Sequence, residues 1–234
     1  FLVIVGNLGV SVILLTLVIK AVLFPLAYKS FVAMSKMKKL QPEMEKIKER
    51  AGDDKQKLQQ EMLGLYKKEK VNPASGCLPI LLQIPIFFSL YKVIFVTLEM
   101  RHAPFILWID DLSAPDPSSW LNLFGLLPYD VTGLPAILTF LSIGLFPILM
   151  GVTMWMQQKL NPAPTDPVQA QIFGLMPFFF MFLLGQFAAG LVIYWVANNV
   201  LTFSQQYIIM RSQGVQVDFF GNVKRSFKRK RPAE

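Results

Sequence analysis

A single lysine, Lys20, lies within an otherwise apolar run that extends from Phe1 to Tyr28. A charged side chain costs at least about 2.5 kcal/mol at the centre of a membrane helix, so it is rarely kept there without a use. Two interpretations are open: the ammonium group ends a span and reaches the headgroups, or it lines a polar site. The second is favoured by Thr16, one helical turn earlier on the same face, and by the apolar residues that continue to Tyr28.

The last apolar segment, Leu191–Met210, carries a second set of polar side chains. Asn198, Thr202 and Gln205 fall on one helical face, and Trp195 lies a turn before them. Polar groups in membrane helices usually face the bundle interior and hydrogen-bond to one another. Hydrogen bonding between helices is a sufficient explanation for any one of these polar residues. Together with Lys20, however, the set predicts a wet pocket that opens to one side of the membrane.

The sequence offers no groups for covalent or metal chemistry. It has one cysteine, Cys77, and one histidine, His102, which excludes an internal disulfide and a multi-cysteine metal site. It also lacks a glycine-rich phosphate loop and a pair of carboxylates suited to catalysis. We therefore expect a protein that is not an enzyme, with no catalytic residue, no cofactor and no metal.

Composition indicates the fold class. Hydrophobic residues make up 53% of the chain and charged residues 16%, which is typical of a polytopic membrane protein. Backbone amides cannot remain unpaired in lipid, so apolar segments of this length should be helices. We predict an all-α polytopic membrane protein with five transmembrane helices, the first within residues 1–28 and the others at Leu78–Leu98, Leu134–Gln157, Ala170–Gln186 and Leu191–Met210.

The distribution of basic residues predicts the topology. The stretch Lys29–Ser75 holds 12 Lys and Arg residues, and the tail from Arg211 onward holds 7. The loop Glu99–Gly133 holds only Arg101 against 5 acidic residues. Because cytoplasmic loops are enriched in Lys and Arg, the first stretch and the tail are predicted to be cytoplasmic. With five spans, the N-terminus of this chain is then outside and the C-terminus is in the cytoplasm.

The stretch between the first two spans predicts a cytoplasmic antiparallel helical hairpin. One helix starts near Pro42 and stops around Gly52, and Asp53 is expected to cap the second. Apolar stripes at helical spacing support both helices: Met44, Ile47 and Ala51 in the first, Leu58, Met62 and Leu65 in the second. The hairpin is either a solvated connector or a basic docking surface for acidic headgroups, RNA or a partner protein.

Four regions follow from this pattern. We assign the first core transmembrane helix to 1–28, the basic helical hairpin to 29–75, spans two to five with an outer loop at 99–133 to 76–211, and a basic tail to 212–234. Within the tail, Lys224–Arg231 has six basic residues in eight. This segment could hold anionic lipid or contact ribosomal RNA through its phosphates.

Several segments resemble the YidC-type membrane protein insertases, in the family's order and from about Gly6 to Arg211. The matching segments are Tyr66–Pro73, Gly76–Pro79, Gln83–Phe87, Leu107–Ile109, Asp111–Ser113, Met150–Met154 and Gly190–Trp195 with Asn198 and Asn199. The resemblance implies a five-helix core around a hydrophilic groove that is open to the cytoplasm and the lipid. It also implies that spans two and four form the apolar wall along which a substrate helix slides.

The resemblance further implies which residues act. Lys20 falls at the position of the family's groove cation, which is usually arginine. Arginine offers a fork of donors that lysine lacks, so substrates that need bidentate contacts would be handled less well. The residues implied to line the groove or contact substrate are Thr16, Gln158, Tyr194, Trp195, Asn198 and Asn199.

The implied function is insertion of newly made transmembrane segments and short N-terminal tails into the bacterial inner membrane, alone or with the Sec translocon. The implied partners are nascent membrane proteins, the ribosome, the Sec translocon and anionic lipids, and no DNA. A membrane chaperone or assembly factor would use the same groove, and a small-molecule or ion transporter is the remaining alternative. The chain opens at Phe1 without an initiating methionine, and Gram-negative family members carry a further helix and a large periplasmic domain upstream.

Overall fold

The computed structural model describes residues 6–52, 54–76, 78–128, 133–162, 164 and 166–215, so Cys77, Asp53 and the basic segment Lys224–Arg231 lie outside the described residues. Within these ranges every regular element is a helix and no strand is present, which confirms the predicted all-α class. The elements are α2 (Leu8–Val22), α3 (Phe24–Lys39), α4 (Gln41–Ala51), α5 (Lys55–Lys68), η1 (Pro73–Gly76), α6 (Leu78–Val96), η2 (Leu98–Met100), η3 (Leu123–Gly125), α7 (Ala136–Leu141), α8 (Leu145–Leu160), α9 (Pro167–Leu184) and α10 (Ala189–Ser212).

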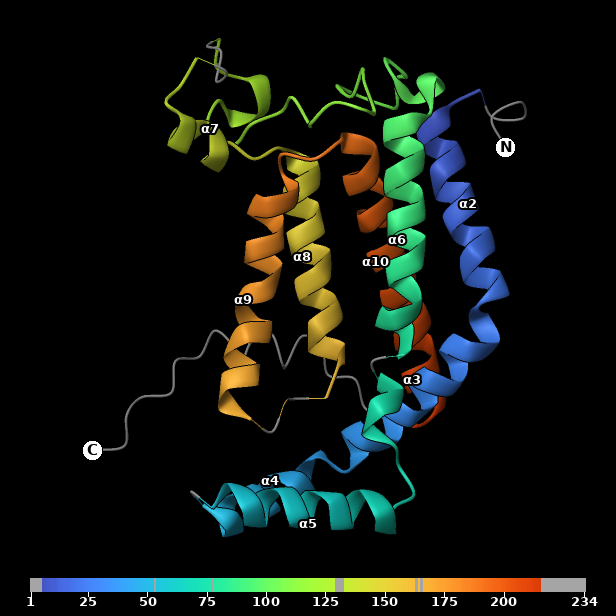
Figure 1. The fold of residues 1–234 in the computed structure, drawn as a ribbon, viewed down its shortest axis with the longest axis vertical. Helices are drawn as coiled ribbons and strands as arrows, with labels where there is room; N and C mark the ends of the chain where they lie inside the picture. The colour runs from blue at the N-terminus through green and yellow to red at the C-terminus, as the bar shows by residue number, and fades with distance from the viewer. Residues whose placement is uncertain are drawn as a thin grey trace.

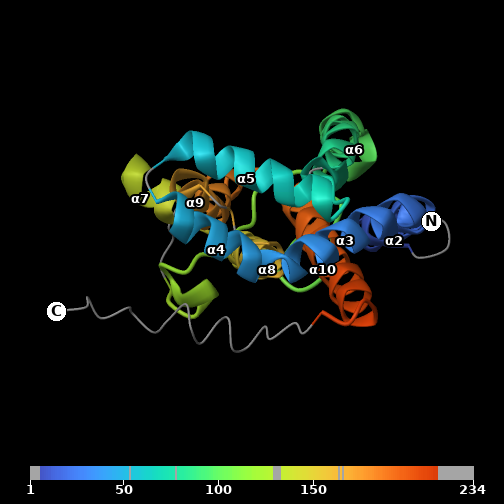
Figure 2. The ribbon, with the colours of Figure 1, turned by 90° about the horizontal axis from the view of Figure 1, so that it is seen from below.

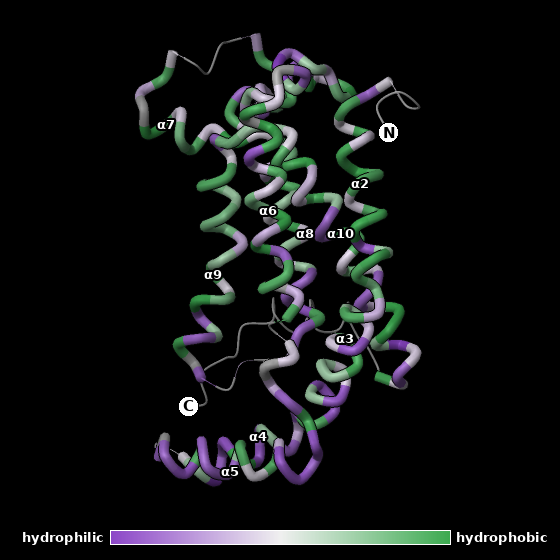
Figure 3. The backbone as a smooth tube through the Cα atoms, turned by 45° about the vertical axis from the view of Figure 1, so that its right-hand side comes forward, coloured by the Kyte–Doolittle hydropathy of each residue, from purple (hydrophilic) through white to green (hydrophobic). Residues whose placement is uncertain are grey.

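The helices that run along the long axis of the molecule are α2, α6, α8, α9 and α10 (Figure 1). Helix α10 is central, since it packs against α2, α3, α6 and α8, while α9 packs on the far side of α8. Helices α4 and α5 lie across one end, and α7 with the connection from α6 to α8 covers the other. The long helices are largely hydrophobic and the crossing pair is largely hydrophilic (Figure 3).

By length and composition, no single described helix is both long and apolar enough to cross a membrane. The pair α2 and α3 meets that requirement only when taken together, and it is bent by 69°. The number of membrane spans therefore stays a prediction.

The bend between α2 and α3 departs from the single helix expected over residues 1–28. Helix α2 ends at Val22, and α3 begins at Phe24 with Pro25 in its first turn. Proline has no N–H to donate, and its ring clashes with the carbonyl four residues earlier, so the helix cannot continue straight. The bend sends α3 away from the bundle axis towards α4 and α5 (Figure 2).

The expected continuous helix over 134–157 is wrong, because Ser142–Gly144 separates α7 from α8. Residues of the preceding loop satisfy the first amides of α8: Leu145 N–H donates to Ser118 Oγ (2.9 Å) and Phe146 N–H donates to Asp116 Oδ2 (3.0 Å). Pro147, in the same turn, has no N–H. A Cβ on Gly144 would lie 2.4 Å from Asp116 Cγ, so only glycine permits this approach.

The crossing pair α4 and α5 buries the apolar stripes expected of it. Met44, Ile47 and Met62, Leu65 are buried in one cluster, together with Met37 from the end of α3. The lysines at the end of α3 bind the bundle: Lys38 Nζ donates to Leu160 O at the end of α8 (2.9 Å), and Lys39 Nζ donates to Gln213 O after α10 (2.7 Å). Burial lowers the pKa of Lys38 below its usual range. Cations at helix C-termini are favourable, so these contacts fix α3 against α8 and α10.

The residue that caps α5 is Asp54, not Asp53 as the sequence suggested. The Asp54 carboxylate accepts from Gln56 N–H and Lys57 N–H, both at 3.0 Å. We expect Asp54→Ala to cost about 1 kcal/mol locally, because two amides lose their acceptor. Hydrogen exchange at residues 56 and 57 should then speed up about fivefold. Asp166→Ala, which removes the equivalent cap of α9, is the control and should leave those two amides unchanged. Equal exchange in Asp54→Ala and the parent would contradict the assignment.

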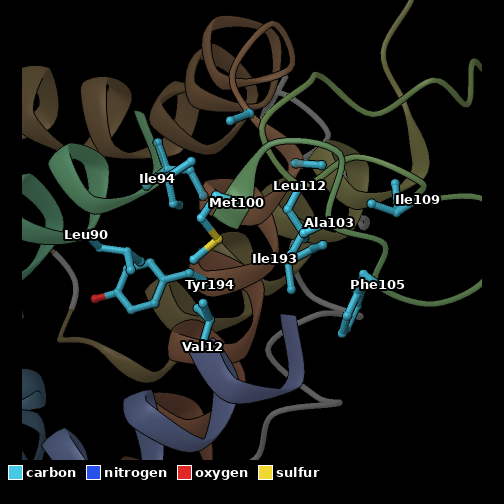
Figure 4. Close-up of a cluster of buried hydrophobic side chains, with 13 residues drawn as sticks. Val12, Leu90, Ile94, Met100, Ala103, Phe105, Ile109, Leu112, Ile193 and Tyr194 are labelled. Carbon is cyan, nitrogen blue, oxygen red and sulfur yellow. The ribbon is translucent and has the colours of Figure 1, made fainter. Parts of the chain in front are cut away.

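A buried cluster closes the end of the bundle opposite α4 and α5 (Figure 4). The cluster contains Ile109 and Leu112 from the α6–α8 connection, Ile193 and Tyr194 of α10, and Val12 of α2. Gly190 N–H donates to Leu112 O (2.9 Å), and a Cβ at position 190 would lie 3.1 Å from that oxygen. The start of α10 is thereby held against the connection.

Candidate functional site

Lys20 lies near the end of α2, half-buried and directed at α10. Its ammonium group donates a hydrogen bond of 2.7 Å to Thr202 Oγ1, and Thr202 Oγ1 donates in turn to Asn198 O (2.6 Å). Among the described residues the ion pairs are Arg50–Glu61 and His102–Asp111, so no carboxylate there pairs with Lys20. Lys20 is therefore a cation held by a hydroxyl group, with its charge not offset by an acidic side chain of the described chain.

A cavity of about 470 Å³ adjoins this lysine. Residues from α2, α3, α6, α8, α9 and α10 line it. Its polar lining is Lys20, Gln83, Gln157, Gln158, Asn161, Asn198, Asn199, Thr202 and Gln206. Its apolar lining includes Phe88 from α6 on one side and Phe173 from α9 on the other, both exposed on the protein surface as well. We call this cavity the polar groove.

A smaller cavity of about 40 Å³ adjoins the polar groove and is lined mainly by α2, the start of α3 and α6. It shares Lys20, Gln83 and Asn198 with the polar groove and adds Thr16 and Tyr194. Thr16 Oγ1 donates to Val12 O (2.7 Å), and Tyr194 Oη accepts from Gln83 Nε2. Both side chains are almost fully buried, so they lie at the inner limit of the polar region.

The structure brings together all seven residues that the family resemblance implied for the groove. Lys20 and Asn198 border both cavities. Gln158, Trp195 and Asn199 line the polar groove, whereas Thr16 and Tyr194 line the smaller one. The Trp195 ring packs edge-on against Phe87 with 5.1 Å between ring centroids, which holds it between α6 and α10. Their contact with a substrate remains a prediction.

Thr202 was expected on the same helical face as Asn198, and it does line the polar groove. The polar lining residues that were not expected are Gln83, Gln157, Asn161 and Gln206. The helical spacing pointed to Gln205, but it is Gln206 that is fully buried. Gln206 accepts from Gln157 Nε2 and donates to Asn161 Oδ1 (3.0 Å), and Asn199 Nδ2 donates to Thr153 Oγ1 (3.2 Å). Gln206 lies seven residues after Asn199, two helical turns along the same face, and that spacing was the available signal.

Three buried polar atoms have no hydrogen-bond partner among the described residues: Gln157 Oε1, Gln158 Nε2 and Asn198 Oδ1. All three residues line the polar groove. A buried polar atom without a partner costs about 1–3 kcal/mol. The groove therefore presents an ammonium group, an amide N–H and amide oxygens that water or a polar segment of another molecule can bind.

The helices beside the polar groove are apolar on their outer surfaces. On α6 the exposed side chains include Leu81, Ile84 and Phe88, and on α9 they include Ile172, Phe173 and Phe179. A soluble protein rarely exposes contiguous apolar areas of this kind. The arrangement defines a class of protein, a helical bundle with a polar groove bordered by two apolar helices. Among the described residues, Lys20 is the one cation that lines this groove.

The chain belongs to the family described as "60Kd inner membrane protein", whose model matches residues 1–216. It is 66% identical over 230 residues to the membrane protein insertase YidC of Jannaschia sp. (strain CCS1), covering 98% of this chain and 37% of that protein. It is 66% identical over 230 residues to the insertase YidC of Dinoroseobacter shibae as well, covering 98% of this chain and 38% of that protein. The chain thus spans less than two fifths of these curated relatives.

A solved structure agrees with the fold. The crystal structure described as "Active YidC insertase crystal structure with the first transmembrane domain resolved" is similar to this chain with a TM-score of 0.62 and 28% sequence identity. The match covers 88% of this chain and 43% of the crystallised one. The resemblance inferred from short sequence segments is therefore confirmed over nearly the whole chain.

Proposed function

We propose that this chain is the insertion core of a membrane protein insertase, which moves transmembrane segments and short N-terminal tails of new proteins into the bilayer. The observation that carries the proposal is the polar groove with Lys20, bordered by the apolar surfaces of α6 and α9. Its relatives' printed name, membrane protein insertase, supports the same function.

The mechanism is physical rather than covalent. A short acidic tail of the substrate enters the polar groove, where the ammonium group of Lys20 and the free atoms of Gln158 and Asn198 replace part of its hydration. This lowers the cost of moving polar groups halfway across the membrane. The substrate's apolar helix meanwhile leaves water along α6 and α9, and burial of its surface supplies about 25 cal/mol per Å².

The topology that suits this mechanism has five spans: α2, α6, α8, α9 and α10. The end of α3 with α4 and α5 forms the cytoplasmic hairpin, and the connection from α6 to α8 lies outside. The many basic residues of 29–75 and the acidic loop 99–133 support this orientation in the bacterial inner membrane. The basic hairpin and tail are then placed to meet the ribosome, the Sec translocon or anionic lipids.

Cross-linking from matched positions tests where the substrate passes. Phe88 and Val96 are both exposed on α6 (62% and 68%), but only Phe88 lines the polar groove. On α9, Phe173 and Leu175 are both exposed, but only Phe173 lines the polar groove. With a photoreactive amino acid at each position, a stalled ribosome bearing a single-span nascent chain should cross-link from 88 and 173 and much less from 96 and 175. Equal cross-linking from all four positions would contradict the proposed path.

A chaperone or assembly factor is the second candidate, because shielding a helix requires the same groove. A transporter is less well supported, since Lys20 pairs with no carboxylate in the described part of the chain, as a proton relay would require.

A further inference from the structure

The connection from α6 to α8 exposes an unusual number of large apolar side chains. Two short segments carry them, residues 120–128 and residues 133–141, the second containing α7. The six that define what we call the apolar rim are Leu123, Phe124, Leu126, Ile137, Leu138 and Phe140. Leu126 is 82% exposed and Ile137 is 70% exposed, so these side chains have almost no cover within the chain.

Two residues of the apolar rim have a strained backbone conformation. Leu123 and Phe124 have φ values of 51° and 59°, in the left-handed region that bulky residues rarely adopt. Such strain persists only where another interaction compensates for it. No such interaction of the Leu123 and Phe124 side chains is evident in the described chain, since both are exposed.

The position of the apolar rim indicates what covers it. Figures 1 and 2 both place α7 beyond α9, at the margin of the bundle on the side away from α2. Phe140 stacks on Phe182 near the end of α9, with 6.3 Å between ring centroids. The rim is therefore continuous with the exposed apolar surface of α9, where Phe178 and Phe179 are 54% and 61% exposed. On the proposed topology that surface faces lipid.

The scarcity of charged residues also indicates that lipid covers this surface. Between Asp116 and Lys159 the sequence contains a single charged residue, Asp130. A protein–protein interface normally has a polar border around its apolar core. Among the described residues between Asp116 and Lys159, none is charged. Trp120, half exposed beside the rim, donates from Nε1 to Leu141 O (2.6 Å) and is the kind of side chain enriched at membrane interfaces.

We propose that the apolar rim lies in the lipid bilayer, at the interfacial level of the leaflet on the side opposite α4 and α5. This inference rests on the proposed membrane topology and adds a second membrane contact, outside the spanning helices. By remaining at the membrane interface, the apolar rim would fix the depth and tilt of α9, one of the two helices that border the polar groove. Lipid acyl chains match this surface, because they are apolar and offer no charges that the protein would have to pair.

Spin-label accessibility in vesicles tests the proposal. The full chain, with its only cysteine changed (Cys77→Ser), is reconstituted into vesicles of phosphatidylcholine and phosphatidylglycerol. Nitroxide labels are placed singly through Leu126→Cys and Ile137→Cys, both at exposed sites outside the core. Phe179→Cys on α9 is the lipid control, and Asp110→Cys, exposed in the same connection, is the water control.

The expected result is that dissolved oxygen relaxes the labels at 126 and 137 more strongly than a water-soluble nickel complex does, as for the label at 179. The label at 110 should show the reverse. Labels at 126 and 137 that behave like the one at 110 would overturn the inference. Labels there that are shielded from both reagents would also overturn it, in favour of a protein partner or a second copy. If the label at 179 reports water too, the membrane topology itself fails, so the two failures are distinguishable.

Discussion

Replacing Lys20 with glutamine is expected to lower insertion of a substrate with an acidic N-terminal tail by about 10- to 100-fold. Among the described residues Lys20 is the one cation that lines the polar groove, and a hydrogen bond to a charged group is worth about 1.5–3 kcal/mol. Glutamine keeps a donor for Thr202 Oγ1 but removes the charge. The effect should therefore be large for acidic tails and small for tails without charge.

Two variants make this prediction specific. Lys92→Gln is the matched control, since Lys92 is exposed on α6 and lines none of the described cavities. It should insert substrate as the parent does. Lys20→Arg keeps the charge and should retain most of the activity. An equal loss in Lys20→Gln and Lys92→Gln, measured as the protease-protected fraction of substrate, would remove Lys20 from the mechanism.

Asp116→Ala is expected to destabilise the protein by about 3 kcal/mol, because the carboxylate supports the whole junction between the outer connection and α8. Its Oδ1 accepts from Trp108 Nε1 (2.9 Å) and from the Ser118 N–H and hydroxyl groups, and its Oδ2 accepts from Phe146 N–H (3.0 Å). Asp116 itself is 9% exposed. Alanine would leave the Trp108 and Phe146 donors without their acceptor.

Denaturant unfolding in detergent measures this change in the free energy of unfolding. Asp110→Ala is the control, because Asp110 is exposed in the same connection, and it should change stability by less than about 0.5 kcal/mol. Asp116→Asn keeps one acceptor oxygen, so its free energy of unfolding should lie between those of Asp116→Ala and Asp110→Ala. If Asp116→Ala is as stable as Asp110→Ala, the hydrogen-bond network at this junction is not important.

Much of the helical layout followed from hydrophobic segments. The segments expected at 78–98, 170–186 and 191–210 are the helices α6 (Leu78–Val96), α9 (Pro167–Leu184) and α10 (Ala189–Ser212). The length of the apolar segments was sufficient to predict these. The stripes that predicted α4 and α5 were equally informative, since Met44, Ile47, Met62 and Leu65 are buried.

The breaks were harder to predict because they depend on distant partners. The gap before α8 exists because Asp116 and Ser118, about 30 residues earlier, provide the acceptors for its first amides. The hydropathy pattern cannot predict hydrogen bonds between residues so far apart in the sequence. The bend at Leu23 had a local signal in Pro25, but its angle of 69° depends on where α3 packs.

The candidate site was predictable as a set of residue types but not as a set of contacts. A lysine in an apolar run and a polar helical face indicated a pocket. The bond from Lys20 to Thr202 joins residues far apart in the sequence and depends on how α2 crosses α10. The choice of Gln206 over Gln205 was missed for the same reason, since the rotation of α10 against α8 decides which amide is buried.

Reconstitution tests the central claim most directly. This chain is incorporated into vesicles, and a single-span protein with an acidic N-terminal tail is translated in their presence. The tail that crosses the bilayer becomes protected from added protease, so the protected fraction measures insertion. We predict protection well above that of empty vesicles, with loss in Lys20→Gln and none in Lys92→Gln. Protection no greater than in empty vesicles, with the protein shown to be folded, would contradict the account.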